Sequence, residues 1–172
     1  NLFSYITGTV EFASAAPEDA ALVCVPPYHV AGIGAAMSHL YAGRKVVYLR
    51  TFDAAEWIAA VRRESVTTAT VVPTMLARIV AELERTGATL PSLRTLAYGG
   101  SKVALPLLRT ALRLLPDVGF VNAYGLTETS STIAVLGPEE HRAALATDDP
   151  VLARRLGSVG TPVPGIELEI RD

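Results

Sequence analysis

Short apolar runs recur along the chain, and longer amphipathic stretches separate them. Most of these runs are continuous rather than alternating, which is typical of strands buried on both faces in a parallel sheet. We expect strands at Ala21–Val25, Lys45–Leu49, Thr68–Val72, Thr95–Tyr98, Gly119–Ala123 and Ile166–Ile170.

The stretches between the runs carry helix signals. Asp53 and Glu56 have the spacing of a capping box, so a helix should begin there. Pro73 is a favourable first helical residue and Gly87 a typical terminating one, so a second helix should lie between them. We expect two further helices, over residues 104–115 and 31–40.

Strands that alternate with helices predict an α/β fold: a mostly parallel sheet flanked by helices, with right-handed crossovers. Residues 138–156 break this alternation, because the segment is polar and rich in alanine. We expect it to be an excursion on the surface. A length of 172 residues allows one domain or a piece of a larger one.

Composition and charge narrow the class of protein. Half of the residues are hydrophobic and 19% are charged, which excludes a disordered chain. The formal net charge is −2, so no basic excess exists to neutralise phosphates, and we expect no nucleic-acid partner. The single cysteine, Cys24, lies in an apolar run and predicts a buried, unreactive thiol. It fits a reducing compartment, and we expect a cytoplasmic protein.

The segment from residue 20 to residue 43 contains no Asp, Glu, Lys or Arg and is long enough to span a bilayer. Pro26 and Pro27 interrupt it, however, and His29 and His39 would be costly in lipid. We therefore expect a strand, a turn and a helix there, and no membrane span. The first ten residues carry no positive charge, so we expect no signal peptide.

Several common motifs are missing from the sequence: the phosphate-binding P-loop, G-x-G-x-x-G, G-x-S-x-G and H-E-x-x-H. Tyr41 and Lys45 have the spacing of a dehydrogenase pair, but no glycine-rich dinucleotide turn precedes them. A reductase or flavodoxin-like module is therefore a weak alternative. The three histidines lack the spacing of metal ligands.

Three stretches that follow predicted strands carry side chains suited to ligands, at the edge where open α/β sheets bind them. The first runs from Tyr98 to Ser101. Gly99 and Gly100 allow a ligand to approach the backbone, and the amides of the following helix favour polar or anionic groups. The alternative is a tight turn between strand and helix with no ligand.

The second stretch covers residues 122–132. Tyr124 offers a flat face to a planar base, and Gly125 removes bulk beside it. The Thr127 hydroxyl can donate a hydrogen bond to a phosphate oxygen, and Glu128 supplies a carboxylate of the kind that Mg²⁺ prefers. The alternative is a polar turn and an edge strand.

The third stretch covers residues 26–32 and contains His29. It also follows a predicted strand directly. The alternative to a ligand role is a helix start with a partly buried histidine.

Taken in their order along the chain, these motifs resemble those of the large N-terminal domain of adenylate-forming enzymes. This superfamily contains acyl-CoA synthetases (AMP-dependent synthetases and ligases), luciferases and the adenylation domains of peptide synthetases. Residues 124–128 (YGLTE) agree with its signature, and residues 99–101 resemble its adenine-binding turn, with Ser101 where alanine is usual. Residues 27–32 resemble its proline–aromatic–His turn, and residues 157–165 its Gly/Pro turn.

The resemblance implies a role for each position. Thr127 would bind the α-phosphate, Glu128 would hold Mg²⁺, and His29 would border the path of the acyl group and pantetheine, so these three are the candidate catalytic residues. The adenine would be bound by Gly99, Gly100, Ser101, Asn122, Ala123, Tyr124 and Gly125.

The implied activity is that of an AMP-forming acid–thiol ligase. A small-molecule carboxylic acid would react with ATP in the presence of Mg²⁺, and the acyl group would pass to coenzyme A. The family's phosphate loop, ribose-binding aspartate and C-terminal lysine domain have no counterpart in the chain. We therefore expect residues 1–172 to be a fragment of the AMP-binding N-terminal domain that is inactive by itself.

Two alternatives remain open. Amino-acid-activating domains of peptide synthetases carry an Asp after the aromatic residue of the proline–aromatic–His turn, to pair with the substrate ammonium. Here His29 holds that place, and a neutral imidazole is a poor partner for a buried cation, which favours an acyl or aryl acid. A non-catalytic nucleotide-binding module is the second alternative, against which the intact Tyr124, Thr127 and Glu128 argue.

Overall fold

The computed structural model describes residues 2–170, and Ser131 through its backbone alone. Within this range a seven-stranded sheet has the strand order β2-β1-β3-β4-β5-β6-β7. The elements are α1 (Leu2–Thr9), β1 (Ala20–Val23), α2 (Val30–Tyr41), β2 (Lys45–Tyr48), α3 (Ala54–Arg63), β3 (Thr68–Val71), α4 (Pro73–Thr86), β4 (Thr95–Gly99), α5 (Leu105–Leu114), β5 (Gly119–Leu126), β6 (Ser131–Leu136), α6 (Pro138–Ala146), α7 (Pro150–Arg154), the 3-10 helix η1 (Arg155–Gly157) and β7 (Thr161–Pro162).

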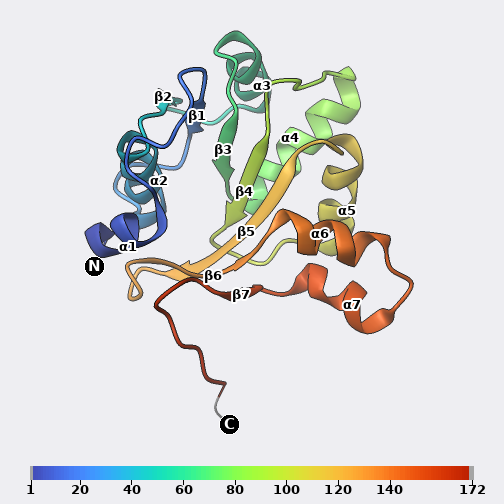
Figure 1. Cartoon of the computed structure of the whole chain (residues 1–172). Helices are drawn as coiled ribbons and strands as arrows, with labels where there is room; N and C mark the ends of the chain where they lie inside the picture. Colours follow the sequence, from blue (N-terminus) through green and yellow to red (C-terminus); the bar gives the residue numbers. More distant parts are fainter. Residues whose placement is uncertain (1, 171–172) are drawn as a thin grey trace.

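The sheet is parallel from β2 through β1, β3 and β4 to β5. Strands β6 and β7 then add to it in antiparallel orientation (Figure 1). The predicted α/β fold with a mostly parallel sheet is confirmed. Because the first five strands are parallel, their carboxyl ends meet at one edge, where the three candidate stretches begin.

The hydrophobic core lies between the sheet and helices α3, α4 and α5, which pack against one another in that order. Trp57 from α3 and Ile79 from α4 are fully buried, as are Leu96 in β4 and Phe120 in β5. All four residues of β1 are buried, as its continuous apolar run predicts. The sheet therefore gains its stability mainly from apolar area removed from water.

Local signals place the helices as predicted. The Asp53 carboxylate accepts a hydrogen bond from the Glu56 backbone N–H (3.0 Å) and caps α3, while the Glu56 carboxylate accepts one from Arg63. Pro73 opens α4, and Gly87 ends it in the left-handed region at φ +65°. The helices expected over residues 104–115 and 31–40 are α5 and α2.

The strand predicted at Ile166–Ile170 is wrong. This segment has no strand geometry, and Ile170 is 100% exposed. Alternating Ile, Glu and Leu residues suit a strand, but a strand needs a neighbour to complete its ladder, and none pairs with this segment within residues 2–170. Strands β6 and β7 were not predicted, because β6 begins inside the polar run after β5 and β7 is two residues long.

The expectation that residues 138–156 form a surface excursion holds only in part, because most of the segment is exposed but three of its residues pack into the structure. Helix α6 buries His141 and Ala144 completely or nearly so, and η1 buries Leu156. Alanine side chains are small and let α6 approach β5 closely, while the polar residues of the segment face outward. The segment is part of the packed structure.

Cys24 is buried, and burial raises the pKa of its thiol to about 11. The thiol is therefore protonated and unreactive at neutral pH, as its apolar surroundings predict. The charge-free segment around it forms β1 and α2. Among residues 2–170, no helix is long and apolar enough to cross a membrane.

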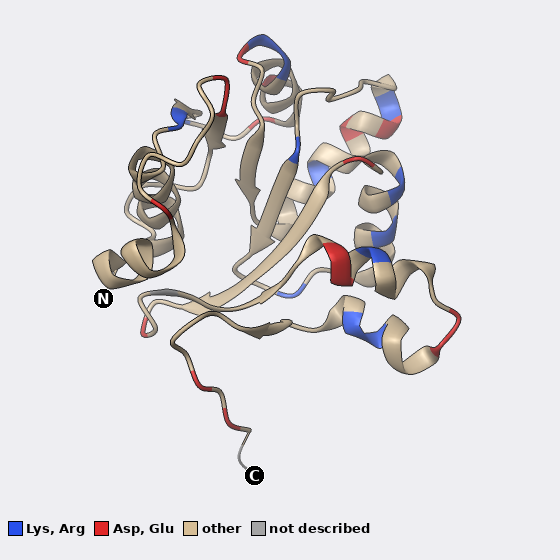
Figure 2. Cartoon of the chain, in the orientation of Figure 1, with Lys and Arg blue, Asp and Glu red and all other residues tan. Residues whose placement is uncertain are grey.

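Charged residues are unevenly distributed. Figure 2 shows acidic and basic residues together on α3, α4 and α6, whereas the charged residues of α5 and α7 are all basic. Helices α1 and α2 contain no Asp, Glu, Lys or Arg, and some of their apolar side chains are exposed, among them Phe3 and Leu40. The least polar side of the molecule is therefore that of α1 and α2.

Stability should fall when the pH is lowered from about 6.5 to about 4. Burial, and then the Arg44 guanidinium that donates to Nδ1 of His39 (3.3 Å), lower the pKa of His39 from 6.5 to about 4. In this window the unfolded chain binds a proton that the folded chain does not, which costs up to ~3 kcal/mol of stability. Urea unfolding at a series of pH values measures the slope of the free energy of unfolding against pH. In His39→Gln the slope should be shallower, and equal slopes would contradict the prediction.

Replacing Gly99 by alanine should destabilise the sheet. A Cβ at this position would lie 2.3 Å from the Ala123 carbonyl oxygen of β5, and backbone atoms cannot give way cheaply. We expect a loss of about 1–3 kcal/mol in the free energy of unfolding. Gly8→Ala in α1 is the control, because nothing lies within 4 Å of that Cβ. Equal stability of the two variants would show that the strands can separate without cost.

Candidate functional site

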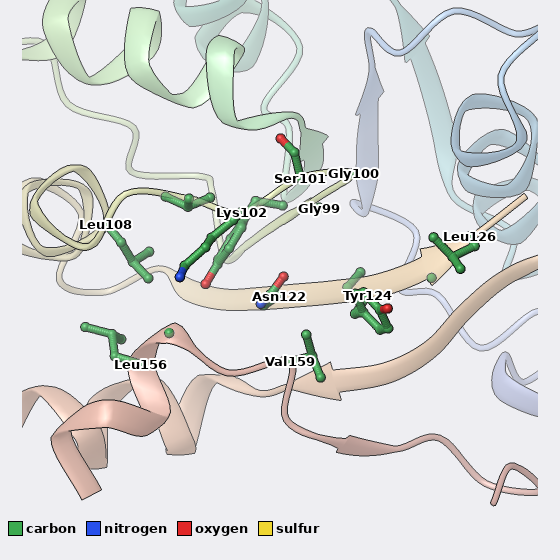
Figure 3. A pocket seen from close by; sticks show the side chains of 15 residues that line it. Gly99, Gly100, Ser101, Lys102, Leu108, Asn122, Tyr124, Leu126, Leu156 and Val159 are labelled. Carbon is green, nitrogen blue, oxygen red and sulfur yellow. The ribbon is translucent and has the colours of Figure 1, made fainter. Parts of the chain in front are cut away.

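A cavity of about 270 Å³ opens where β4 and β5 end (Figure 3). Its walls come from four parts of the chain: the end of β4 with the turn after it, helix α5, strand β5, and the segment around η1. All seven residues that the resemblance assigns to adenine line this one cavity: Gly99, Gly100, Ser101, Asn122, Ala123, Tyr124 and Gly125.

The two glycines of the turn serve different purposes. Gly100 has φ +87°, a left-handed conformation that side chains rarely adopt, and it allows the tight turn from β4 toward α5. The missing side chain of Gly99 faces the β5 backbone rather than a ligand. The expectation that both glycines make room for a ligand therefore needs correction, because Gly99 makes room for β5.

Tyr124 lies at the mouth of the cavity, and its side chain is 40% exposed. The pairing of β5 with β6 shifts register between Tyr124 and Gly125. Such a bulge bends a strand and changes the direction of the side chains around it. One face of the Tyr124 ring is therefore available to a planar group in the cavity.

The side chain of Asn122 has a defined orientation. Its Nδ2 donates a hydrogen bond to the backbone carbonyl of Ser158 (2.9 Å), so its Oδ1 points the other way, into the cavity (Figure 3). An amide oxygen there accepts a hydrogen bond and offers none. A ligand with an N–H group at this position would therefore complement the Asn122 Oδ1.

The cavity is also lined by Val159 of the Gly/Pro turn and by residues that the sequence did not single out for ligand binding, among them Lys102, Leu108 and Leu156. Figure 3 shows the Lys102 side chain extending along the cavity, and it is the one charged group among the lining residues described. In the sequence, the position of Lys102 directly after the glycine turn was the signal that could have indicated its place at the cavity. Leu108 and Leu156 belong to helical segments, whose approach to the turn depends on tertiary packing.

Thr127 and Glu128 lie outside the cavity lining, in the exposed turn between β5 and β6. Thr129 closes this turn, because its Oγ1 accepts from the Leu126 N–H and donates to the Leu126 carbonyl (both 2.9 Å). Within residues 2–170, neither the Thr127 hydroxyl nor the Glu128 carboxylate has a hydrogen-bond or ion-pair partner. Both side chains are therefore free to meet a ligand.

His29 is the N-cap of α2, and its Nδ1 accepts a hydrogen bond from the Ala31 backbone N–H (3.1 Å). The side chain is exposed rather than partly buried, and it does not line the cavity. Strand β6 contacts α2, so the hairpin of β5 and β6 reaches toward the helix that His29 begins (Figure 1).

No group of three or more His, Cys, Asp or Glu residues that could hold a metal ion by itself occurs among residues 2–170. Glu128 offers a single exposed carboxylate. This fits Mg²⁺, which proteins usually bind through one or two carboxylates together with substrate phosphates and water. A Mg²⁺ site at this turn would therefore need further ligands from a bound phosphate or water.

Comparison with known proteins agrees with this geometry. The family model of AMP-binding enzymes matches residues 1–172. A fatty acid–[acyl-carrier-protein] ligase, ScoC of Streptomyces coeruleorubidus, is 33% identical over 90% of this chain and 28% of its own length. The 2-succinylbenzoate–CoA ligase of Bacillus pumilus is 34% identical over 90% of this chain and 29% of its own. The chain thus spans less than a third of these relatives.

Two solved structures share the fold. O-succinylbenzoate coenzyme A synthetase of Bacillus subtilis, in complex with ATP and magnesium, has a TM-score of 0.75 and 29% identity, covering 92% of this chain and 30% of that one. The amide bond synthetase McbA of Marinactinospora thermotolerans has a TM-score of 0.82 and 26% identity, covering 99% and 32%. Since the family model matches the whole sequence, the chain belongs to the AMP-binding enzyme family.

Proposed function

We propose that residues 1–172 are part of the AMP-binding domain of a longer ligase, which activates a carboxylic acid with ATP and passes the acyl group to coenzyme A. The observation that carries this proposal is the cavity. It brings together the glycine turn after β4 and the residues of β5 from Asn122 to Gly125. The exposed Thr127 and Glu128 follow directly on the same strand.

The cavity suits adenine. The exocyclic amine of adenine can donate to the Oδ1 of Asn122, whereas guanine carries a carbonyl oxygen at the same ring position and would be repelled. The Tyr124 ring can stack on the base, which is attractive for any planar π system. The backbone of Gly99, Gly100 and Ser101 then borders the base on its other side.

The hairpin turn suits the phosphates. A nucleotide whose base occupies the cavity would extend along β5 toward the turn, where the Thr127 hydroxyl can donate to an α-phosphate oxygen. Glu128 would hold Mg²⁺, which supplies positive charge that offsets the charge of the phosphates during the reaction. His29, at the start of α2, would border the acyl group and the pantetheine arm.

The chemistry has two steps. The substrate carboxylate attacks the α-phosphorus of ATP and pyrophosphate leaves, which gives an acyl-adenylate. The thiol then attacks the acyl carbon and AMP leaves. Neither step requires a nucleophile from the protein, so the chain's own residues contribute by holding the reactants in line and by donating hydrogen bonds to charged oxygens.

The names of the relatives support a thiol as the acceptor of the acyl group. The 2-succinylbenzoate ligases are named for transfer to coenzyme A. ScoC, named for transfer to an acyl-carrier protein, makes a carrier-bound thiol the competing acceptor. An assay of the complete protein with coenzyme A and, separately, with a phosphopantetheinylated carrier protein distinguishes them.

Acyl and aryl acids should be better substrates than amino acids. His29 stands where an aspartate would be needed to pair with an ammonium group, and a cation buried without a partner is costly. Acid-dependent exchange of pyrophosphate into ATP, measured over a panel of fatty, aromatic and α-amino acids, tests this. Highest activity with an α-amino acid would reverse the assignment, and no exchange with any acid would contradict the proposed function.

Glu128→Gln should reduce adenylate formation at least ~10²-fold, because a neutral amide replaces the charged Mg²⁺ ligand; this corresponds to about 2.7 kcal/mol. Pyrophosphate release at saturating Mg²⁺ measures the effect. Glu139→Gln is the matched control, since Glu139 is exposed on α6 and does not line the cavity. Near-normal activity of Glu128→Gln would exclude Glu128 as the metal ligand.

A further inference from the structure

A buried pair of polar side chains lies beneath the cavity. The Tyr98 hydroxyl and the Nε2 of His141 are 2.8 Å apart, and the Nδ1 of His141 is 2.7 Å from the Gly137 carbonyl oxygen. Tyr98 is 2% exposed and His141 is 0% exposed. Neither residue has a part in the proposed chemistry, and a buried polar pair of this kind needs another explanation.

The partners fix the direction of both hydrogen bonds. A carbonyl oxygen can only accept, so Nδ1 carries the proton and donates to Gly137. Nε2 is then left with a lone pair and accepts from the Tyr98 hydroxyl. Burial lowers the pKa of His141 and raises that of Tyr98, so both side chains stay neutral and the chain from Tyr98 through His141 to Gly137 has one orientation.

This pair connects the segment from α6 to η1 with both strands that form the cavity. Tyr98 itself lines the cavity and directly precedes Gly99 on β4. The His141 ring makes an edge contact with the Tyr98 ring (centroids 5.7 Å apart) and a tilted contact with the Phe120 ring of β5 (6.5 Å).

The same segment reaches the cavity at two more points. Leu156 contributes to its wall, and the Ser158 carbonyl holds the amide of Asn122. The part of the chain that follows β6 thus supports the glycine turn from one side and orients Asn122 from the other.

We propose that His141 is a positioning residue for the nucleotide: by holding the Tyr98 hydroxyl, it ties the glycine turn at the end of β4 to helix α6 and keeps the base cavity in the shape that binds adenine. This inference rests on the proposed function. It assigns a binding role to a residue that touches no substrate, and to a segment whose sequence predicts only a surface excursion.

Three variants of the complete protein separate this role from a contribution to stability alone. His141→Leu leaves the Tyr98 hydroxyl buried without an acceptor, and Tyr98→Phe leaves Nε2 without a donor. The double variant removes both polar groups, so no unsatisfied group remains, but it also removes the tether. Replacing both partners of a buried hydrogen bond by apolar groups can be nearly neutral for stability.

We expect His141→Leu and Tyr98→Phe to raise the KM for ATP about tenfold, with kcat changed less than about twofold, because the defect lies in binding. The double variant should regain the unfolding temperature of the unaltered protein but keep the raised KM. A purely structural role predicts that affinity returns together with stability, and that result would overturn the proposal.

Ala144→Gly is the matched control. Ala144 is buried on the same helix, and the change weakens α6 without altering Tyr98 or His141. Its KM for ATP should stay unchanged, and an equal rise would show that any weakening of α6 has the same effect. If His141→Leu does not fold, Tyr98→Phe tests the proposal instead, because it keeps the aromatic ring. An unchanged KM for ATP in Tyr98→Phe would also overturn the proposal.

Calorimetric titration with ATP separates failure of this inference from failure of the proposed function. If the unaltered protein binds no ATP, the proposed function fails and this inference with it. If the unaltered protein binds ATP and the three variants bind it equally well, the positioning role alone is wrong.

Discussion

The close pairing of β4 with β5 is the constraint on which the rest of the structure depends. Gly99 lies opposite Ala123 in the parallel register, and the backbones approach so closely that position 99 has no room for a side chain. This contact brings the glycine turn of one strand beside Asn122 and Tyr124 of the next. Residues more than twenty positions apart in the sequence thus form two walls of one cavity.

The site divides into two regions with different physical character. The cavity is bounded by β4 and β5, and a hydrogen bond to the Ser158 carbonyl orients the Asn122 amide that lines it. The turn with Thr127 and Glu128 is exposed, and these two side chains have no hydrogen-bond or ion-pair partner within the described part of the chain. Recognition of a base needs fixed shape, whereas phosphate and Mg²⁺ need accessible charge and hydroxyl groups, so the division matches the proposed ligand.

The sequence was informative where local chemistry decides the structure. Continuous apolar runs predicted the parallel strands, Asp53 and Gly87 predicted helix ends, and the residues assigned to adenine do line one cavity. It failed where tertiary contacts decide. The segment Ile166–Ile170 has suitable residues for a strand but no neighbour to pair with among residues 2–170.

The burial of His141 shows the same limit at a single residue. A polar, alanine-rich segment is typical of the surface, and nothing in its own sequence indicates that its histidine hydrogen-bonds to a tyrosine 43 positions earlier. Lys102 is a similar case, because its position along the cavity depends on how the turn after β4 meets α5. Contacts between elements that are distant in the sequence cannot be predicted from the sequence of either element alone.

The hydrogen bonds that orient Asn122 and His141 end on the main chain, at the carbonyls of Ser158 and Gly137. Every amino acid has such a carbonyl, so a substitution at position 158 can change the side chain without deleting the acceptor. If the cavity binds a base as proposed, its recognition is robust to mutation at position 158, while Asn122 itself stays constrained. Over evolutionary time, the supporting segment can therefore drift in sequence, provided that its backbone path is kept.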